Sequence, residues 1–489
     1  MITSPLRPKL KVLADELIDK IIDEAIELLE TTGVMIEGRK ILKFLQELGV
    51  RTDPSRGRAF MQREMVHKSL RSAPSTIKLY DREGELAATL EGDNVYFNPG
   101  SAALDILDYP SGEMRKPVTN DLVRLARLTD SLKHIKLQST ALISTDIPQA
   151  MSDWYRLFIG FLYCRKPMVT GIFAEESLPL MKDMLVIIRG DERRLAEKPL
   201  AIFDACPSPP LKWSALTCQS VIDCARWGIP SEIISMPMAG ATSPVTLAAA
   251  LVQHTAENLS GVVISQLVKP GAPVIYGGSA SILDMRRGTT PMGAIETMLL
   301  NSAYCQIGKR LGMPVHAYMG LSDAKTLDAQ SGLEGGMSIL LAALAGINVV
   351  SGPGMLEFES CQSLEKLVID DEICGMTYRL LEGIAQRDEP IATELLKDVK
   401  PDSHFLSSPH TLRWFRKELY FPSIIERRTH GEWLKQGGKS LADKAAEKVE
   451  ELLRKEVSPP LASDLQKGLR ELALSESRTH GLEKLPLSE

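Results

Sequence analysis

The feature that most constrains this chain is a series of eight short runs rich in β-branched or aromatic residues, each followed by a stretch with helical spacing of its apolar residues. Alternation of this kind predicts parallel strands joined by crossover helices. Eight such units are the number that closes a (β/α)8 barrel, the TIM-barrel fold, and we expect that fold here. The runs are 95–98, 135–139, 168–173, 200–204, 232–236, 274–276, 315–318 and 347–351.

The segments before and after these units predict two flanking domains. Residues 1–92 are expected to form an N-terminal helical cap, with a helical pair interrupted at Gly33 and a short hairpin over 77–90. Residues 93–386 would then be the barrel, which makes it the catalytic domain.

A C-terminal helical extension is predicted over residues 387–489. Its stretch 402–433 holds much of the aromatic content of the chain, and an amphipathic helix follows over 440–455. We expect this arm to pack on the barrel or on a second subunit, which favours a homo-oligomer.

Composition excludes several classes of function. The 489 residues carry a formal net charge of −6 with scattered Lys and Arg, whereas nucleic-acid binders usually show a basic stripe. No signal-peptide core and no apolar run of membrane-spanning length occur. Seven cysteines without a CxxC pair, and eight dispersed histidines, argue against disulfides and a structural metal site. We therefore expect a cytoplasmic protein with no nucleic-acid or membrane partner and no metal.

The segments that leave the predicted strands are rich in Gly, Pro and polar residues, although Gly and Pro also punctuate ordinary loops. In a barrel these segments meet at the C-terminal mouth, where active sites lie. Glycine lets a backbone approach a ligand closely, so Gly278, Gly352 and Gly354 are predicted cofactor-contacting positions. Loops after the seventh and eighth strands also bind phosphate in many barrels, and the sequence leaves both uses open.

Several segments of the last third of the chain occur in a distinctive order. They are Ser322-Asp323-Ala324-Lys325, Asp328-Ala329-Gln330-Ser331-Gly332-Leu333-Glu334, Ser351-Gly352-Pro353-Gly354, 364–372, His404-Phe405-Leu406 with His410-Thr411, and Trp433-Leu434-Lys435-Gln436-Gly437. In this order they resemble the trimethylamine methyltransferase family, including its members that lack pyrrolysine and act on quaternary amines such as glycine betaine. The resemblance covers roughly residues 15–454.

The resemblance implies an enzyme that moves a methyl group from an amine to the Co(I) form of a corrinoid. The corrinoid (cobalamin) would be carried by a separate partner protein, so no tightly bound cofactor is expected. Trimethylamine enzymes of the family use pyrrolysine, whereas this sequence has standard residues only. A quaternary ammonium already departs as a neutral tertiary amine and needs no general acid, which favours a betaine-like donor over a simple methylamine. A modified lysine at Lys325 would reverse that choice.

A trimethylammonium group makes no conventional hydrogen bond, so an aromatic cage with a nearby carboxylate is expected. Rings on barrel strands more often fill interior layers, which is the alternative for each candidate. The candidate rings are Phe97, Phe173, Phe203, Tyr276, Tyr318 and Phe358. Of these we predict Phe97, Tyr276, Tyr318 and Phe358 as substrate-binding, together with Lys325 and Gln330.

The candidate acids are Asp204, Asp323, Asp328, Glu334, Glu357 and Glu359. We predict Glu334, Asp323 and His316 as catalytic, although an aspartate ahead of a helix ordinarily caps it and a strand histidine is ordinarily a core residue. A carboxylate on the donor could be bound by His316, by Lys325, or by Arg286 with Arg287.

Two other functions remain open. One is a phosphate-binding barrel lyase or isomerase that uses Lys325 as a Schiff-base nucleophile. The other is a non-catalytic protein that binds quaternary amines.

Overall fold

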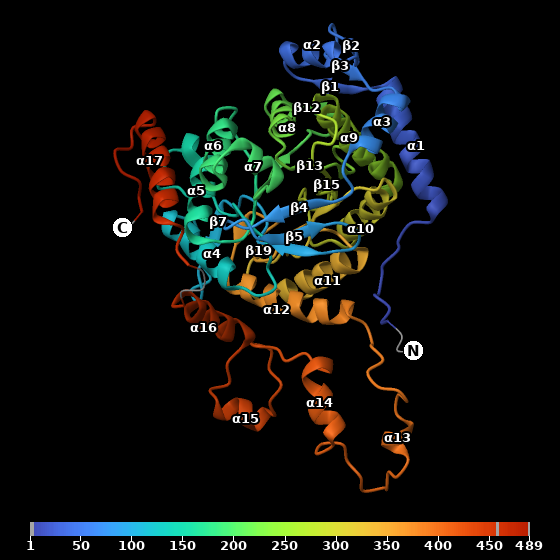
Figure 1. Cartoon of the computed structure of the whole chain (residues 1–489), viewed down its shortest axis with the longest axis vertical. Coiled ribbons are helices and arrows are strands. Elements are labelled where there is room, and N and C mark those ends of the chain that lie inside the picture. The colour runs from blue at the N-terminus through green and yellow to red at the C-terminus, as the bar shows by residue number, and fades with distance from the viewer. Residues whose placement is uncertain (1–3, 456–458, 488–489) are drawn as a thin grey trace.

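All eight predicted runs are strands, and they lie at the centre of the protein (Figure 1). The structure is a computed structural model, and it describes residues 4–455 and 459–487. The strands are β6 (Tyr96–Asn98), β9 (Gln138–Ser139), β10 (Met168–Thr170), β11 (Ala201–Ala205), β13 (Ser231–Ser235), β15 (Val274–Gly278), β17 (His316–Tyr318) and β18 (Val349–Ser351).

The strands form two hydrogen-bonded sheets in which every neighbouring pair is parallel. The five-stranded sheet has the order β15-β13-β11-β10-β9, and the three-stranded sheet has the order β17-β18-β6. Single parallel bridges, Phe97 to Ile135 and Tyr276 to Val315, connect the two sheets at their edges. Among the described residues the eight strands do not form one continuous ladder, because β9 and β17 are only two and three residues long. The fold is therefore mixed α/β with parallel sheets.

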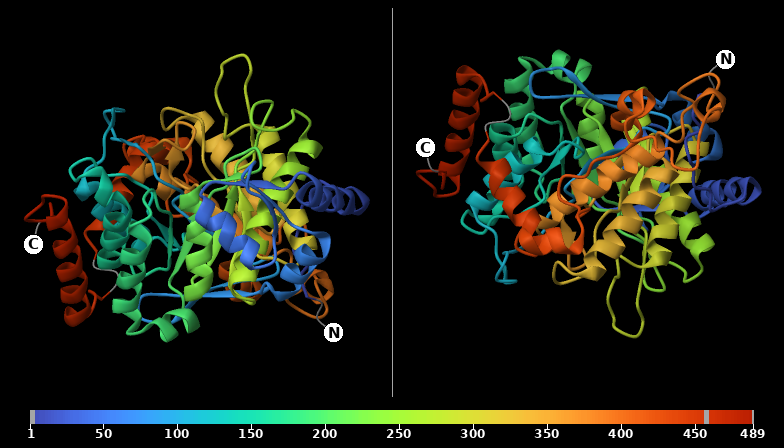
Figure 2. Two further views of the ribbon diagram at one scale, coloured as in Figure 1. Left: turned by 90° about the horizontal axis from the view of Figure 1, so that it is seen from above. Right: turned by 90° about the horizontal axis from the view of Figure 1, so that it is seen from below.

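The predicted crossover helices surround these sheets (Figures 1 and 2). The apolar spacing predicts a helix over 336–345, but α11 (Ala329–Ala345) begins seven residues earlier, because the Asp328 carboxylate accepts hydrogen bonds from the amides of Gln330 and Ser331. A further short helix, α7 (Glu192–Glu197), precedes β11. The crossover helices are α4 (Thr119–Ser131), α5 (Ser152–Tyr163), α6 (Ser177–Arg189), α8 (Ala215–Trp227), α9 (Leu247–Val268), α10 (Ile295–Arg310), α11 (Ala329–Ala345) and α12 (Leu364–Leu381).

The predicted hairpin closes the amino-terminal end of the strands. Its arms β4 (Ile77–Tyr80) and β5 (Leu86–Leu90) are antiparallel. Their apolar side chains form one buried cluster with side chains of both parallel sheets. The cluster comprises Ile77, Leu79, Ala88, Leu90, Leu137, Val169, Ile202, Ile275 and Val349. This apolar layer excludes water from the amino-terminal end of the strands.

The N-terminal helical pair is confirmed as α1 (Asp15–Thr31) and α2 (Arg39–Glu47), with the break at Gly33. Helix α3 (Arg63–Ser72) follows, and α1 and α3 both pack on α9. The sequence did not predict the small sheet beside them, since its strands have only two or three residues. They are β1 (Val34–Ile36), β2 (Arg51–Asp53), β3 (Arg58–Phe60) and β12 (Lys212–Trp213).

Two further small sheets lie among the loops that follow the parallel strands. One has the order β19-β20-β7-β8, and the other pairs β14 with β16. A short helix, η1 (Gln149–Met151), precedes α5. The strands are β7 (Asp105–Leu107), β8 (Met114–Arg115), β14 (Met238–Ala239), β16 (Ser281–Ile282), β19 (Met355–Leu356) and β20 (Cys361–Gln362).

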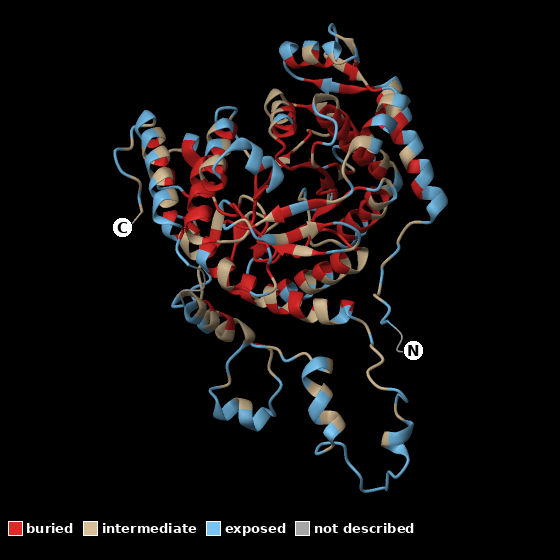
Figure 3. Ribbon diagram, in the orientation of Figure 1, coloured by how far each residue is buried: buried red, intermediate tan, exposed pale blue. Residues whose placement is uncertain are grey.

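The C-terminal arm projects away from the rest of the protein (Figures 1 and 3). Helices α13 (Thr393–Leu396), α14 (Pro409–Glu418) and α15 (His430–Lys435) contain no buried residue. The chain then returns through α16 (Leu441–Leu453), which packs on α12, and α17 (Ser463–Thr479), which packs on α5 and α6. The domain boundaries at 92/93 and 386/387 stay predictions.

Two other properties concern the described part of the chain. Within residues 4–455 and 459–487, no helix combines the length and the apolar character needed to cross a bilayer. The same residues include no cluster of three His, Cys, Asp or Glu side chains placed to bind a metal ion.

Candidate active site

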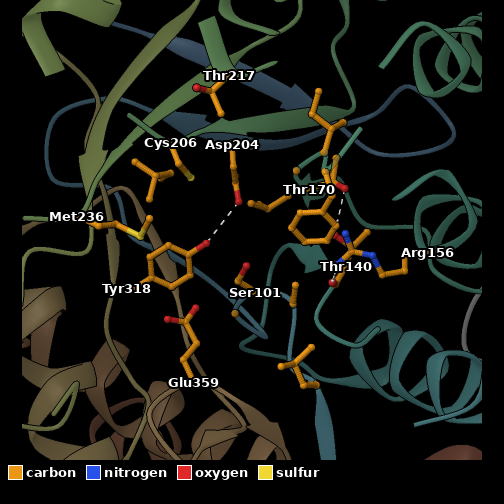
Figure 4. A pocket seen from close by; sticks show the side chains of 18 of the residues that line it. Ser101, Thr140, Arg156, Thr170, Asp204, Cys206, Thr217, Met236, Tyr318 and Glu359 are labelled. Atoms are coloured by element: carbon orange, nitrogen blue, oxygen red, sulfur yellow. Dashed lines mark hydrogen bonds between the residues drawn. The ribbon is translucent and has the colours of Figure 1, made fainter. Parts of the chain in front are cut away.

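A cavity of about 630 Å³ opens at the carboxyl ends of the parallel strands, and we call it the pocket (Figure 4). Strand residues Thr170, Asp204 and Tyr318 form part of its wall. Helix α5 contributes Arg156, and the turn between β19 and β20 contributes Glu359. The pocket thus collects side chains from elements far apart in the sequence, at the end of the strands where barrel-type enzymes place their sites.

One wall of the pocket is acidic. Asp204 on β11 lies directly opposite Glu232 on β13 in the strand register, and the Tyr318 hydroxyl lies 3.3 Å from Asp204 Oδ2 and donates to it. Burial raises the pKa of Asp204 to about 6. Burial and the charge of Asp204 raise the pKa of Glu232 well above its usual value. Charged carboxylates are costly here because the apolar layer below excludes water.

Glu359 enters the pocket from a strained turn. The consecutive residues Glu357, Phe358 and Glu359 have φ of 50°, 55° and 74°, in the left-handed region that non-glycine residues rarely adopt. Burial and the charge of Asp204 raise the pKa of Glu359 to about 8. On the outer side of the turn, Lys325 Nζ lies 3.8 Å from the centroid of the Phe358 ring and 2.9 Å from Glu357 Oε2.

The opposite wall carries a buried guanidinium. Arg156 Nη1 donates to the carbonyl of Thr140 at 2.7 Å, and Nε donates to the carbonyl of Ser152 at 3.1 Å. Its Nη2 lies 3.6 Å from Asp153 Oδ1, and the Phe173 ring covers the group at 5.1 Å. Burial lowers the pKa of Arg156 to about 10, so the group is still cationic at neutral pH. The pocket therefore has an acidic end and a basic end (Figure 4).

A buried polar layer lies behind the acidic wall. His316 Nε2 lies 2.9 Å from Ser351 Oγ and 3.7 Å from Glu232 Oε1, and Asn98 Nδ2 donates to the same serine oxygen at 2.8 Å. Burial lowers the pKa of His316 to about 3, so the imidazole is neutral. His316, predicted as catalytic, does not line the pocket, but its ring meets the ring of the pocket residue Tyr318 edge-on at 4.9 Å.

Of the predicted substrate-binding residues, Tyr318 and Phe358 line the pocket. Phe97 and Tyr276 are on the opposite faces of their strands, towards the helices. The Phe97 ring meets the Tyr378 ring of α12 edge-on at 5.7 Å, and the Tyr276 hydroxyl lies 3.0 Å from Thr255 Oγ1 of α9. The sequence-based prediction counted rings at strand ends but did not determine which face each ring occupied.

The other predicted side chains hold the neighbouring loops rather than forming the pocket wall. Glu334 Oε2 accepts from Ser322 Oγ at 2.6 Å and from the amide of Asp323 at 2.8 Å. Asp323 in turn accepts from the amides of Met292 and Gly293. Gln330 donates to Glu334 Oε1. The Lys325 side chain is 52% exposed, and its Nζ also donates to the carbonyl of Asp323 at 2.6 Å.

Packing accounts for glycine at the three predicted cofactor-contacting positions. A Cβ at Gly278 would overlap the His254 ring and a backbone carbonyl, and one at Gly352 would overlap another carbonyl. A Cβ at Gly354 would overlap the Gln362 side chain. None of the three lines the pocket. At these positions glycine lets the backbone approach other residues of the protein closely, and not a cofactor.

Two important residues, one in the pocket wall and one behind it, were absent from the sequence-based candidates. Arg156 is on α5, whereas the predicted site residues come from predicted strands and the loops that follow them. Glu232 is the first residue of the predicted run 232–236 and precedes two isoleucines. A charged residue in such a run is a signal that could have identified it, since buried charges require partners.

Comparisons with known proteins cover nearly the whole chain. A family model described as trimethylamine methyltransferase (MTTB) matches residues 2–479. The trimethylamine methyltransferase MttB of Methanosarcina barkeri is 32% identical over 452 residues, which span 91% of this chain and 90% of that protein. A glycine betaine methyltransferase of Desulfitobacterium hafniense is 30% identical over 433 residues, spanning 88% and 90%.

A solved structure shows the same fold at much lower identity. The monomethylamine methyltransferase MtmB of Methanosarcina barkeri superposes with a TM-score of 0.50 at 9% identity, covering 91% of this chain and 89% of that one. The family that the sequence resembles is confirmed. This chain belongs to the trimethylamine methyltransferase family.

Proposed function

We propose that this protein transfers a methyl group from a quaternary, betaine-like amine to the Co(I) corrinoid of a partner protein. The observation that carries the proposal is the division of the pocket into an acidic end with rings and a basic end. Membership of a methyltransferase family supports it. Relatives named for trimethylamine and for glycine betaine match the chain about equally, so identity alone does not separate the two donors.

We also propose that the two parallel sheets act as one (β/α)8 barrel. Eight parallel strands alternate with crossover helices, and a bridge connects the sheets at each edge. The hairpin packs an apolar layer at one end, and the pocket opens at the other. This arrangement matches the division of a barrel into a stability end and a catalytic end.

The acidic end would hold the ammonium group. Asp204 and Glu359 supply negative charge, and the Tyr318 ring supplies a π face. A quaternary ammonium is attracted to both without needing a hydrogen bond. Since such a donor leaves as a neutral tertiary amine, these carboxyls need not protonate it. Their role is to bind the donor and to orient one methyl group towards the mouth.

The basic end would hold the carboxylate of the donor. A guanidinium has five N–H groups, and the Arg156 hydrogen bonds found within the described residues use two of them. The remaining donors suit a carboxylate, which arginine binds in fork geometry. Arg156 therefore replaces His316, Lys325 and Arg286 with Arg287 as the proposed carboxylate-binding residue, because it lines the pocket and they do not.

The mouth of the pocket fits an apolar methyl acceptor. Leu104, Phe173 and Met236 line the pocket, and each is 41–58% exposed. The partner's corrinoid would supply a strong metal nucleophile that accepts the methyl cation. The three side chains would exclude water from the mouth when the partner is docked. We propose that the protein works in the cytoplasm as a homo-oligomer, which light scattering of the purified chain tests.

The rival functions receive less support. Lys325 does not line the pocket, and its amine is occupied by Asp323, Glu357 and the Phe358 ring, an arrangement that does not suit a Schiff-base nucleophile. Gly352 and Gly354 are packed against the protein's own atoms and offer no open phosphate cradle.

The proposal is tested with Co(I) cobalamin and separate additions of glycine betaine, tetramethylammonium and trimethylamine. We expect methyl-Co(III) absorbance with glycine betaine. Arg156→Met should abolish the advantage of glycine betaine over tetramethylammonium, and Arg156→Lys should keep part of it. Tight binding of glycine betaine with no methylation would instead identify a non-catalytic binding protein, and methylation from trimethylamine alone would refute the donor class.

A further inference from the structure

Three carboxyl groups from different elements meet at the acidic wall, although one of them is not part of the pocket surface. Asp204 and Glu359 line the pocket, whereas Glu232 lies behind Asp204 and is 0% exposed. Asp204 and Glu232 are opposite each other on adjacent strands. Two neighbouring carboxyl groups can hydrogen-bond to each other only when one of them carries a proton.

The surroundings supply no hydrogen-bond donor that would let Glu232 ionise. Within the described residues, both of its carboxyl oxygens are buried without a donor, as is Asp204 Oδ1. The His316 imidazole is 3.7 Å away, but its pKa is lowered to about 3 by burial, so it carries no charge. An ionised Glu232 would be a buried charge without a partner, which is among the most costly arrangements in a protein.

The remaining groups that face this cluster do not neutralise it. Arg156 is the basic residue among the described pocket-lining residues, and it is shared with Asp153. Burial and the nearby acids raise the pKa of the Cys206 thiol, and burial and Asp204 raise that of the Tyr318 hydroxyl, so both are neutral. The three carboxyl groups therefore have one nearby cation among the described side chains, Arg156, which already pairs with Asp153. With too little positive charge nearby, these carboxyls keep protons more readily than free carboxyl groups do.

We infer that binding of a permanently cationic ligand expels protons from the Asp204, Glu232 and Glu359 cluster, and that Glu232 is a positioning residue that sets this exchange through Asp204. The inference rests on the proposed function, since it assumes that the ammonium group occupies the acidic end. An ammonium beside Asp204 favours the ionised carboxylates, so each proton leaves to solvent as the cation enters. The acidic wall thereby gains negative charge when a cation is present.

The exchange has a defined pH dependence. Ligand binding favours the deprotonated cluster, so affinity should rise with pH between about 6 and about 8, the pKa values of Asp204 and Glu359. Release of one proton corresponds to a change in Kd of about tenfold per pH unit. Above this window Asp204 and Glu359 are already ionised, and the dependence should flatten. An aromatic cage without titrating acids would give no such slope.

The test is isothermal titration calorimetry of the full chain with tetramethylammonium chloride at pH 7, in buffers of different ionisation enthalpy. This probe has no titratable group, so any proton detected comes from the protein. We expect the wild type to release about one proton per cation bound. Glu232→Gln and Glu359→Gln should each lower the count, and the double variant should bring it close to zero. Glycine betaine as a second probe should give the same ranking.

Glu257→Gln is the matched control. Glu257 is also a buried glutamate with a raised pKa, caused by burial, but it accepts hydrogen bonds from Ser235, Leu211 and Gln253 away from the pocket surface. Its substitution should leave the proton count unchanged. A structural effect of the Glu232 substitution would weaken binding without changing the count.

The outcomes separate the two proposals. Binding without proton release by the wild type, or an unchanged count in the double variant, overturns the proton exchange and leaves the proposed function standing. If neither tetramethylammonium nor glycine betaine binds, both the proton exchange and the proposed function are overturned. Should Glu232→Gln fail to fold, the pH dependence of Kd in the wild type decides, because a flat Kd from pH 5.5 to 8.5 is incompatible with the exchange.

Discussion

A buried ion pair connects the two loops that shape the acidic end of the pocket. Lys366 Nζ donates to Asp370 Oδ2 at 2.6 Å and to the carbonyl of Gly320 at 3.2 Å. The same Asp370 oxygen accepts from the amide of Gly354 at 2.6 Å. Gly320 follows the strand that carries Tyr318, and Gly354 precedes the turn that carries Glu359. Helix α12 thus fixes both loops through one pair of charges.

We expect Lys366→Met to destabilise the protein by about 3–5 kcal/mol, the usual cost of leaving one charge of a buried pair without its partner. The two side chains are 2% and 1% exposed, so water cannot compensate for the lost ammonium. Lys20→Met is the matched control. Lys20 also pairs at i,i+4 spacing, with Glu24, but the side chains are 72% and 51% exposed. Its loss should cost less than about 0.5 kcal/mol.

The assay is urea denaturation followed by intrinsic fluorescence at pH 8 and at pH 5. Burial already raises the pKa of Asp370, and removing Lys366 removes the charge that opposes this. An unpaired Asp370 would therefore be protonated more readily in the folded state than in the unfolded state, so the loss of stability should be smaller at pH 5 than at pH 8. A loss below about 1 kcal/mol at pH 8, or a larger loss at pH 5, would refute this account of the pair.

Three further predictions concern single residues. Lys325→Met removes the cation from the Phe358 ring, a contact of roughly 0.5–1 kcal/mol, and should lower kcat/KM for methyl transfer several-fold; complete inactivation would indicate a direct chemical role. Asp328→Ala removes the N-cap of α11 and should cost about 1 kcal/mol in thermal denaturation, with an unchanged Tm as the contrary result. Glu372 is buried, which opposes its ionisation, but hydrogen bonds from Ser423 and Tyr420 lower its pKa. The stability that these bonds contribute is present above the unfolded pKa and is lost as pH falls through the folded pKa. Proteolysis of the C-terminal arm should therefore accelerate in acid. Glu372→Gln should remove most of that pH dependence.

The sequence predicts the strands and helices of this fold well because each strand is a short buried run followed by a long amphipathic stretch. It does not predict the two edges where the ladder is reduced to a single bridge. The bridges at Phe97 and Tyr276 join strands whose partners are distant in the chain, and local pattern contains no information on the length of a ladder. The small sheets around the pocket are missed for a related reason, since their strands have two or three residues.

The site is predictable only in part. Tyr318 and Phe358 are correctly placed near the carboxyl ends of strands, whereas Phe97 and Tyr276 share that location but face the helices. The direction of each side chain depends on the register of the whole sheet, and a shift of one residue reverses it. Arg156 reaches the pocket because α5 packs beside β10. The apolar residues around Arg156 in α5 indicate that it is buried, but they do not indicate which cavity it faces.

The pocket combines a rigid part and a strained part, and the two suit different tasks. Asp204 and Tyr318 are on strands of the two different sheets, and backbone hydrogen bonds to neighbouring strands hold each of them in its own sheet. Glu359 is instead held by three successive left-handed residues, which cost of order 1–3 kcal/mol each and persist only when their surroundings over-determine them. Here the amide of Glu357 donates to the carbonyl of Ala324, next to Lys325, so the turn is fixed by the same loop that places a cation on Phe358. A change in that loop therefore moves Glu359 relative to Asp204, and with it the charge that the pocket presents to a cation.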